Sequence, residues 1–311
     1  MITFVMPIWN GARHLREALA SLLQQGARVV CVDDASTDDS AAFVRASGVE
    51  LVQNEQRLGL AGNWNRCMAL VTTPFFVLAH QDDVYEPNYA ATMLALIEQH
   101  PRAFIAHCKT TAIDHDGRAI STPAARYKES LWPQDDPYEE SGDPGLRRLA
   151  RGNFIVAPSV VFRTDAARAI GPFSPFAFVT DWEYWLRGLL AGYTIAGTQR
   201  RLVRFRRHAE TATHALERTL DRYREEIALQ QWIEREARIP AQYATVSRIV
   251  LSEIAAALAA GDRGRAAELL SFGRAEIPRF PAALAGLAIR SGKFGGRALL
   301  AAQAVALRFA S

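Results

Sequence analysis

Two pairs of adjacent carboxylates follow apolar stretches of this sequence. Asp33 and Asp34 close "ARVVCVDD", and Asp82 and Asp83 close "FFVLAHQDD". Acidic side chains are unfavourable at the edge of a core unless a cation or water meets them. The partners to consider are a metal ion, a basic group of the protein, and solvent. The choice among them depends on whether the fold brings the two pairs together.

The first hundred residues alternate between short apolar runs and amphipathic segments that end on glycine or open on proline. The runs predict strands over 2–8, 27–34, 49–54 and 74–79, and the periodic segments predict helices over 12–26, 36–48, 61–71 and 87–100. This alternation predicts a mostly parallel sheet with helices on both faces.

In such sheets the ligand lies beyond the carboxyl ends of the strands. Asp33 and Asp34 end the second predicted strand, and Asp82 and Asp83 end the fourth, so all four carboxylates are expected at one edge. Their mutual repulsion favours a divalent cation, which prefers oxygen ligands.

The second hundred residues have a looser pattern. We expect two strands within 104–120 around a turn at Asp116-Gly117, and a long loop over 121–146, which is rich in Pro, Asp, Glu and Ser. A strand over 153–163, a helix over 181–192 and a strand over 193–208 follow. From Leu216 onward the pattern is helical, with breaks near Pro240, Gly261, Pro278 and Gly292.

Five segments, in this order, resemble an inverting family 2 glycosyltransferase of the GT-A fold: "PIWNGARHLREALASLLQQ", "CVDDASTDDS", "NEQRLGLAGNWN", "HQDD" and "TDWEYWLR". The likeness covers roughly residues 1 to 210. It implies a Rossmann-like α/β domain over 1–215, with a nucleotide-sugar-binding half (1–103) and an acceptor or catalytic half (104–215), followed by a helical region over 216–311. It also implies transfer of a sugar from a nucleotide-diphosphate sugar to a hydroxyl of a glycan or lipid-linked glycan, in bacterial surface polysaccharide synthesis.

The resemblance assigns the metal site to Asp83, which would bind Mg²⁺ or Mn²⁺, while Asp82 would face the ribose of the donor. His208 matches a histidine that completes the metal shell, and neutral imidazole suits Mn²⁺. The alternatives are a solvated turn in which Asp83 caps the next helix, and a surface histidine at 208. His80 is interpreted as structural, and Gln81 stands where many relatives carry an acid.

The resemblance assigns the nucleotide site to the first three strand ends. Asp34 would accept a hydrogen bond from the base, beside Asp33, and Gly59 would let the backbone come close to the nucleotide. Alternative roles stay open. Asp33 and Asp34 would be anions near the start of the helix after Ser36, and Asn63 and Asn65 would cap a helix. The remaining residues assigned to this site are Pro7, Asn10, Asn63 and Asn65.

Asp181 occupies the position of the catalytic base, which takes the proton of the acceptor hydroxyl. Thr180 precedes it where relatives usually carry Glu. Because Asp181 begins a helix, an N-cap is the alternative role, and the helix dipole is expected to lower its pKa. Glu183 is the second candidate for the base. Trp182 and Trp185 offer faces for a sugar or pack in the core.

The composition limits the classes of partner and the cellular location that we expect for this protein. A net charge of +3 without a basic block argues against nucleic acid. Three scattered cysteines predict free thiols in a reducing compartment. We expect no signal peptide and no membrane-spanning helix, hence a cytoplasmic protein. The apolar, basic segment 293–311 is compatible with a helix lying on an anionic membrane, or with one packed on the helical region.

Two other classes of protein compete with the transferase. A nucleotidyltransferase would carry a "GxGxR"-like loop after the first strand, and "PIWNGARH" does not supply one. A non-catalytic nucleotide-sugar binder or assembly scaffold stays open because of the departures at Thr180 and Gln81.

Overall fold

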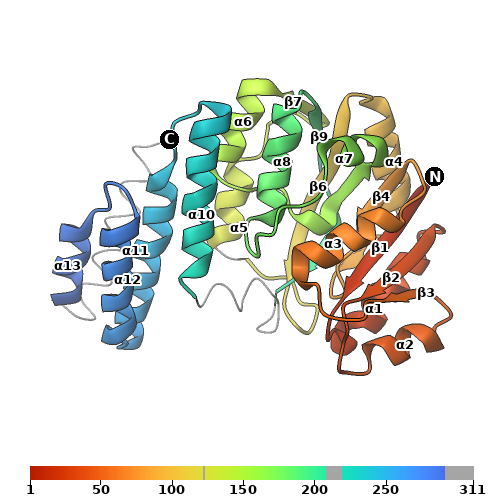
Figure 1. Cartoon of the computed structure of the whole chain (residues 1–311), viewed down its shortest axis with the longest axis horizontal. Coiled ribbons are helices and arrows are strands. Elements are labelled where there is room, and N and C mark those ends of the chain that lie inside the picture. The colour runs from red at the N-terminus through yellow and green to blue at the C-terminus, as the bar shows by residue number, and fades with distance from the viewer. Residues whose placement is uncertain (122, 208–218, 291–311) are drawn as a thin grey trace. The chain divides into compact units, whose positions relative to one another are not determined.

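The computed structural model describes residues 1–121, 123–207 and 219–290 of the 311-residue chain. The chain divides into two compact units, Met1–Ala215 and Leu216–Ser311. The first carries all the strands and every described residue of the predicted site (Figure 1).

The first unit alternates strands and helices through its N-terminal half and adds a more mixed second half. Its strands are β1 (Ile2–Ile8), β2 (Arg28–Asp33), β3 (Glu50–Gln53), β4 (Phe75–Leu78), β5 (Val84–Tyr85), β6 (Ala103–Ile113), β7 (Tyr138–Ser141), β8 (Val160–Arg163) and β9 (Thr194–Arg206). Its helices are α1 (Ala12–Leu23), α2 (Ser40–Ala46), α3 (Gly59–Leu70), α4 (Tyr89–Gln99), α5 (Pro123–Ser130), α6 (Gly142–Arg151), η1 (Ala157–Ser159), α7 (Thr164–Ile170) and α8 (Thr180–Leu190).

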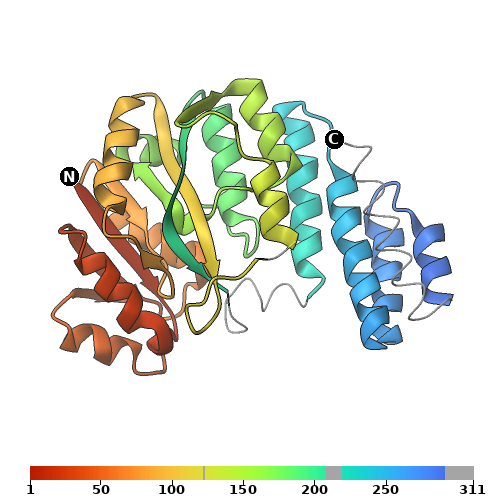
Figure 2. The same cartoon turned by 180° about the vertical axis from the view of Figure 1, so that it is seen from behind.

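All nine strands form one mixed sheet in the order β3-β2-β1-β4-β8-β6-β9-β5, with β7 paired to β9. The four N-terminal strands are parallel, so the carboxyl ends of β2 and β4 lie on either side of the end of β1. Strand β8 runs antiparallel to β4, and its N-terminal end therefore faces the carboxyl end of β4. The long strands β6 and β9 run side by side in parallel (yellow-orange and green in Figure 2).

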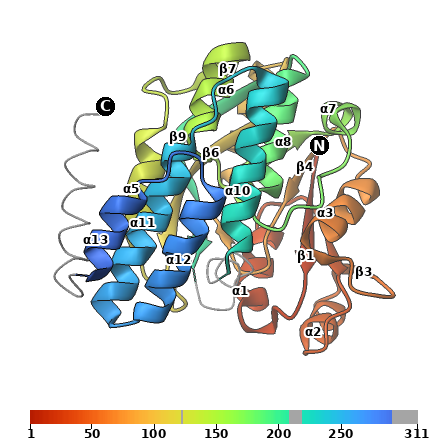
Figure 3. The same cartoon turned by 60° about the vertical axis from the view of Figure 1, so that its left-hand side comes forward.

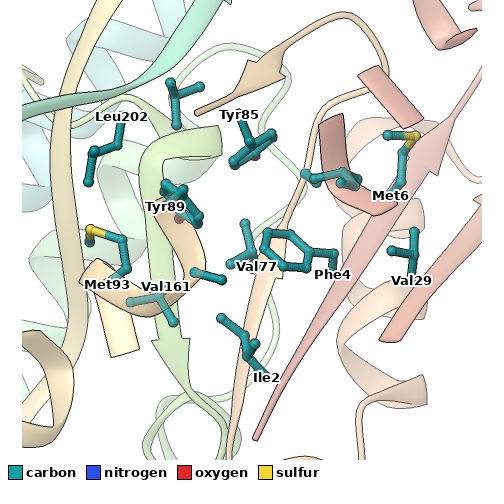
Figure 4. Close-up of a cluster of buried hydrophobic side chains, with 14 of the residues drawn as sticks. Ile2, Phe4, Met6, Val29, Val77, Tyr85, Tyr89, Met93, Val161 and Leu202 are labelled. Atoms are coloured by element: carbon teal, nitrogen blue, oxygen red, sulfur yellow. The ribbon is translucent and has the colours of Figure 1, made fainter. Parts of the chain in front are cut away.

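Strict alternation along the buried strands directs side chains to both faces of the sheet. On one face, Phe4 and Val77 pack against Tyr85 and Tyr89, with Leu15 of α1 in the same cluster (Figure 4). The Phe4 and Tyr85 rings meet edge to face at 5.7 Å. On the other face, the Phe76 ring stacks on that of Phe162 at 4.6 Å, and Trp185 of α8 lies 5.6 Å from Phe162. The sheet is therefore covered on both sides, as the βα rhythm predicts.

Two expectations for the second half are wrong. Segment 104–120 forms one strand, β6, followed by an isolated bridge between Ile113 and Ala119 rather than a second strand. Segment 121–146 is not a long loop, because it contains α5, β7 and the start of α6. Its mostly polar composition includes buried apolar residues, among them Leu131, Trp132, Tyr138 and Leu146, and Tyr138 lies in β7, which pairs with β9.

The second unit consists of helices: α10 (Asp221–Trp232), the π-helical turn η2 (Ile233–Ala237), α11 (Tyr243–Ala260), α12 (Arg263–Glu276) and α13 (Ala282–Arg290). Helices α11 and α12 lie side by side and share a core that includes Val250, Ile254 and Leu269 (Figure 3). Helix α11 is the one described helix that is long and apolar enough to cross a membrane by length and composition. Its buried face builds the core of this unit, which accounts for that composition. The basic segment 293–311 lies outside the described residues.

Candidate functional site

The ends of β1, β2 and β4 are joined by direct hydrogen bonds. The Asp34 amide donates to the Ile8 carbonyl at 2.8 Å, which ties the end of β2 to that of β1. The Gln81 side chain accepts from the Trp9 amide at 2.8 Å and donates to the Trp9 carbonyl at 3.0 Å, which ties the segment after β4 to the same point. The two acidic pairs therefore flank one short stretch of backbone, and the sheet brings them to one edge.

Asn10 fastens the loop after β1 to the loop after β2. Its backbone adopts φ +47°, its amide donates to the Ser36 hydroxyl at 2.9 Å, and its side-chain carbonyl accepts from the Thr37 amide at 2.8 Å. Pro7 lies beside Val32 in the last part of β1. Asn10 thus shapes the predicted nucleotide site through the backbone of both loops.

Asp34 is almost fully buried and organises the turn that opens α3. One carboxylate oxygen accepts from the Asn54 side chain at 2.9 Å and the Leu58 amide at 2.7 Å. The other accepts from the Gly59 amide at 2.9 Å, and Gly59 has φ +76°, a conformation that favours glycine. A carboxylate offers about four acceptor positions, and these bonds within the described part of the chain use three of them.

The other predicted nucleotide residues have mixed surroundings. Asp33 is buried, one of its oxygens accepts from Gln53 at 3.1 Å, and the other has no hydrogen-bond partner in the described part of the chain. Asn63 bridges Asn54 and the Val32 carbonyl. Asn65 exchanges two hydrogen bonds with the backbone of Phe173, at 2.7 and 3.0 Å, so its amide holds the segment before α8.

Asp83 is fully buried, and β9 reaches it. One carboxylate oxygen accepts from the Arg206 amide at 2.7 Å. The Arg206 guanidinium is also buried and donates to the Asp82 carbonyl at 2.9 Å and to Glu17 at 2.6 Å. Burial raises the pKa of Asp83 well above that of an ordinary carboxyl, the charge of Asp82 raises it further, and Arg206 opposes both. Arg206 thus holds the acidic segment in place. Its guanidinium does so through hydrogen bonds to the Asp82 carbonyl and to Glu17.

A possible cation site is formed by His80, Asp82 and Asp83, whose nearest ligand atoms all lie within 4.8 Å of one another. The second oxygen of Asp83 has no hydrogen-bond partner within the described ranges and lies 3.8 Å from Nδ1 of His80. Burial lowers the pKa of His80, although Asp82 opposes this, so the imidazole is neutral at pH 7. Two carboxylates and a neutral imidazole suit Mn²⁺ or a similar divalent ion. His208 lies outside the described residues.

Asp181 lies in the first turn of α8, and Asn153, in the segment before β8, donates to it at 3.0 Å. Asn153 belongs to the segment that leads into β8, and the N-terminal end of β8 faces the carboxyl end of β4, the strand that Asp82 and Asp83 follow. The expected lowering of its pKa is wrong. Burial raises the pKa of Asp181, and Lys128 and Asn153 only partly oppose it. A carboxylate with a raised pKa is a stronger base.

The neighbours of Asp181 on α8 serve the core. Glu183 is buried and forms an ion pair with Arg187 at 3.2 Å, one turn later on the same helix. Trp182 donates its indole N–H to the Leu149 carbonyl at 2.8 Å, and Trp185 is fully buried. The Thr180 hydroxyl donates to the Phe176 carbonyl, which ends the preceding loop. Of the two acids in this turn, Glu183 is paired with Arg187, and Asp181 is therefore the candidate for a role toward a ligand.

The sequence analysis did not predict the cation–π pair of Arg57 and Trp9. Trp9 follows β1 and is 41% exposed, and the Arg57 guanidinium lies 3.5 Å above the centre of its ring. The pair joins the loops after β1 and β3 on the edge where Asp34 lies. A large exposed aromatic residue directly after a predicted strand was the available signal.

Comparison with known proteins bears on the fold and the sequence family of the chain. Residues 3–148 match the sequence profile of the family described as Glycosyl transferase family 2. An uncharacterised glycosyltransferase of Rickettsia prowazekii is 24% identical over 232 residues, which cover 72% of this chain and 69% of the relative. The succinoglycan biosynthesis protein ExoU of Rhizobium meliloti is 30% identical over 101 residues, 30% of each chain.

Solved structures of S. aureus TarS (residues 1–349) share the fold. The complex with UDP-GlcNAc superposes with a TM-score of 0.60 at 16% identity and covers 80% of this chain and 70% of that one. The complex with UDP gives a TM-score of 0.57 at 17% identity, over 80% and 69%. The profile match shows a family 2 glycosyltransferase sequence over residues 3–148, and the sheet order and the likeness to TarS show the GT-A fold.

Proposed function

We propose that this glycosyltransferase moves a sugar from a nucleotide-diphosphate sugar to an acceptor hydroxyl with inversion, and that it depends on a divalent cation. The observation that carries the proposal is the arrangement at the sheet edge, with Asp34 beside the end of β1 and Asp82 and Asp83 after β4. Asp181 is held by Asn153, in the segment that leads into β8.

The donor's nucleotide would lie over the ends of β1 and β2. Asn10, Asp33 and Asp34 shape the two loops there, and Gly59 presents its backbone beside them. The indole of Trp9 offers a flat surface for a base or ribose at the same edge. The UDP and UDP-GlcNAc bound by TarS support a nucleotide-sugar donor.

Asp82 and Asp83, with His80 beside them, would hold the cation. When bound, Mg²⁺ or Mn²⁺ supplies positive charge that stabilises the diphosphate leaving group. Arg206 keeps the two acids in place through its amide and guanidinium. His208 is assigned to the same shell by the sequence pattern alone.

Asp181 would accept the proton of the acceptor hydroxyl as that oxygen attacks the anomeric carbon from the face opposite the diphosphate. The atoms balance: the new bond joins the acceptor oxygen to the sugar, the bond to the diphosphate breaks, and the proton moves to Asp181. The raised pKa of Asp181 suits this task, because a stronger base takes the proton more readily.

The experiment compares release of nucleoside diphosphate from nucleotide-sugars by the wild type and by Asp181→Asn. Donors are chosen by a thermal-shift screen with Mn²⁺, since a ligand that binds the folded state raises the apparent stability. We expect turnover to fall by about 10²- to 10⁴-fold in Asp181→Asn while donor binding stays. Asp143→Asn is the matched control, because Asp143 also lies in the first turn of a helix and is exposed.

A binding protein without activity makes a different prediction. It would show thermal shifts with nucleotide-sugars but no turnover in either chain. If neither EDTA nor the Asp181 substitution changes the turnover, both the dependence on a cation and the role of Asp181 as the base would be wrong.

The biological setting we propose is polysaccharide synthesis, with a glycan or lipid-linked glycan as acceptor. The similarity to a succinoglycan biosynthesis protein supports it. We place the enzyme in the cytoplasm, at the inner face of the membrane when the acceptor is lipid-linked. Three buried free cysteines agree with a reducing compartment. Cell fractionation with a periplasmic marker tests the location.

A further inference from the structure

We propose that His80 supplies a nitrogen ligand to the cation, beside Asp82 and Asp83, and that this chain therefore prefers Mn²⁺ to Mg²⁺. The inference rests on the proposed function, which requires the cation. It adds a histidine that precedes the acidic pair and sets the choice of metal.

The separation of His80 and Asp83 fits a shared ion better than a direct bond. Nδ1 of His80 lies 3.8 Å from the buried Asp83 oxygen, beyond the roughly 3.2 Å limit of a good hydrogen bond. Two atoms that each lie about 2.1 Å from one cation are about 3.0 to 4.2 Å apart, depending on the angle between the bonds. The observed distance falls within that range.

Packing fixes the imidazole in this position. The His80 ring lies 5.5 Å from the ring of Trp64, which in turn contacts Phe173 at 5.3 Å. Nε2 of His80 is buried and has no hydrogen-bond partner among the residues described. The adjacent Ala79 amide donates to the Val5 carbonyl at 2.9 Å, which anchors the backbone to β1. The ring is therefore held with Nδ1 toward the carboxylates, and a cation bound at Nδ1 would leave the ring proton on the buried Nε2.

The types of ligand atom in this site set its relative affinity for Mn²⁺ and Mg²⁺. Mg²⁺ favours oxygen ligands in a near-ideal octahedron, whereas Mn²⁺ accepts imidazole more readily. A site with two carboxylates and one ring nitrogen should therefore bind Mn²⁺ more tightly than Mg²⁺.

The test is pulsed EPR of Mn²⁺ bound to the full chain, recorded with Mn²⁺ alone and with Mn²⁺ plus UDP. Coordinated imidazole produces ¹⁴N modulation of the Mn²⁺ signal. Because the sequence pattern assigns His208 to the same shell, the measurement uses a His208→Phe background, in which His80 is the one assigned nitrogen ligand. We expect the modulation there, its loss when His80→Phe is added, and at least a tenfold weaker Mn²⁺ affinity in the double variant. His80→Phe keeps a ring against Trp64 but has no nitrogen.

His80→Asp tests the metal preference and also serves if His80→Phe fails to fold. In the same His208→Phe background it should bind Mn²⁺ without ¹⁴N modulation and shift the relative affinity at least tenfold toward Mg²⁺. Mn²⁺ binding without modulation in His208→Phe, or modulation that persists when either His80 substitution is added to it, would overturn the role of His80 and leave the cation-dependent transfer intact. If Mn²⁺ does not bind and turnover continues in EDTA, both the role of His80 and the dependence of the transfer on a cation would be wrong.

Discussion

Asn153 and Asp181 come from segments 28 residues apart, and a hydrogen bond of 3.0 Å joins their side chains. The Asn153 amide donates to one carboxylate oxygen of Asp181, while the other oxygen accepts from the Trp182 amide at 2.7 Å. The orientation of the proposed base therefore depends on a residue outside its own helix. Asn153 is a positioning residue, since it acts through Asp181.

Removing this amide should change the pH dependence of the reaction. The hydrogen bond from Asn153 lowers the pKa of Asp181, against the larger effect of burial, which raises it. Asn153→Ala should therefore raise that pKa and move the acid limb of the kcat/KM profile to higher pH. We also expect a loss of about 10-fold to 100-fold at neutral pH from misorientation.

Lys128 provides an independent check of the same carboxylate. Its ammonium charge also lowers the pKa of Asp181. Lys128→Met should shift the acid limb in the same direction as Asn153→Ala without loosening the hydrogen bond. A profile that stays fixed in both variants would mean that Asp181 is not the group that titrates in the reaction.

The turn that Asp34 organises allows its structural role to be separated from nucleotide binding. Asp34→Ala removes the acceptor for three N–H groups and should lower the unfolding free energy by about 2–4 kcal/mol. Gly59→Ala should cost only about 1 kcal/mol, because the new Cβ meets no atom within 4 Å and only the positive φ is strained. Urea denaturation measures both.

Asp34→Asn then isolates the proposed contact with the base. The amide still accepts through its oxygen, so most of the turn should survive. We expect a smaller stability loss than in Asp34→Ala, with at least a tenfold drop in nucleotide affinity by calorimetry. Nucleotide affinity equal to that of the wild type would restrict Asp34 to the turn.

The elements of the N-terminal half were predictable because their signals are local. Apolar runs and helical spacing place β1 to β4 and α1 to α4 within a few residues of their observed bounds. Segment 121–146 was not predictable in this way. Its order depends on buried residues such as Leu131, Trp132 and Tyr138, which stand in a mostly polar stretch. Trp132 packs on His107 of β6, and Tyr138 lies in β7, which pairs with β9.

The same distinction applies to the site. The strand pattern predicted that the carboxylate pairs lie at one edge of the sheet, but spacing alone does not distinguish Asp82 from Asp83, to which only the family resemblance assigned different roles. Their difference comes from Arg206, 123 residues after Asp83, whose amide reaches only the second of the pair. The position of His80 likewise depends on its packing against Trp64 of α3.

Gly11 and Gln81 should be energetically coupled. A Cβ on Gly11 would lie 2.3 Å from the Gln81 amide carbon, so Gly11→Ala must expel that amide from its two hydrogen bonds with Trp9. Each single substitution, Gly11→Ala or Gln81→Ala, should cost about 1–2 kcal/mol. In the double variant the clash is gone, so its cost should fall below the sum by about 1 kcal/mol. Strict additivity in a double-mutant cycle would contradict this coupling.

His107 should make the stability of the first unit depend on pH. It is fully buried on β6, hydrogen-bonds the Tyr138 hydroxyl, and burial lowers its pKa to about 3. The unfolded chain, with an ordinary histidine pKa of about 6.5, therefore binds a proton that the folded chain refuses. Stability is full above pH 6.5 and is lost as the pH falls toward 3. Between pH 7.5 and 5 the loss should be about 2 kcal/mol.

His107→Gln tests this assignment, since its amide can still reach Tyr138 but does not titrate. Urea unfolding at pH 7.5 and pH 5 should give the variant a pH-dependent loss that is smaller than that of the wild type by about 2 kcal/mol. The comparison between the two pH values matters, because Gln packs less well than imidazole and lowers stability equally at both. An identical pH-dependent loss in the two chains would assign the titration to another group.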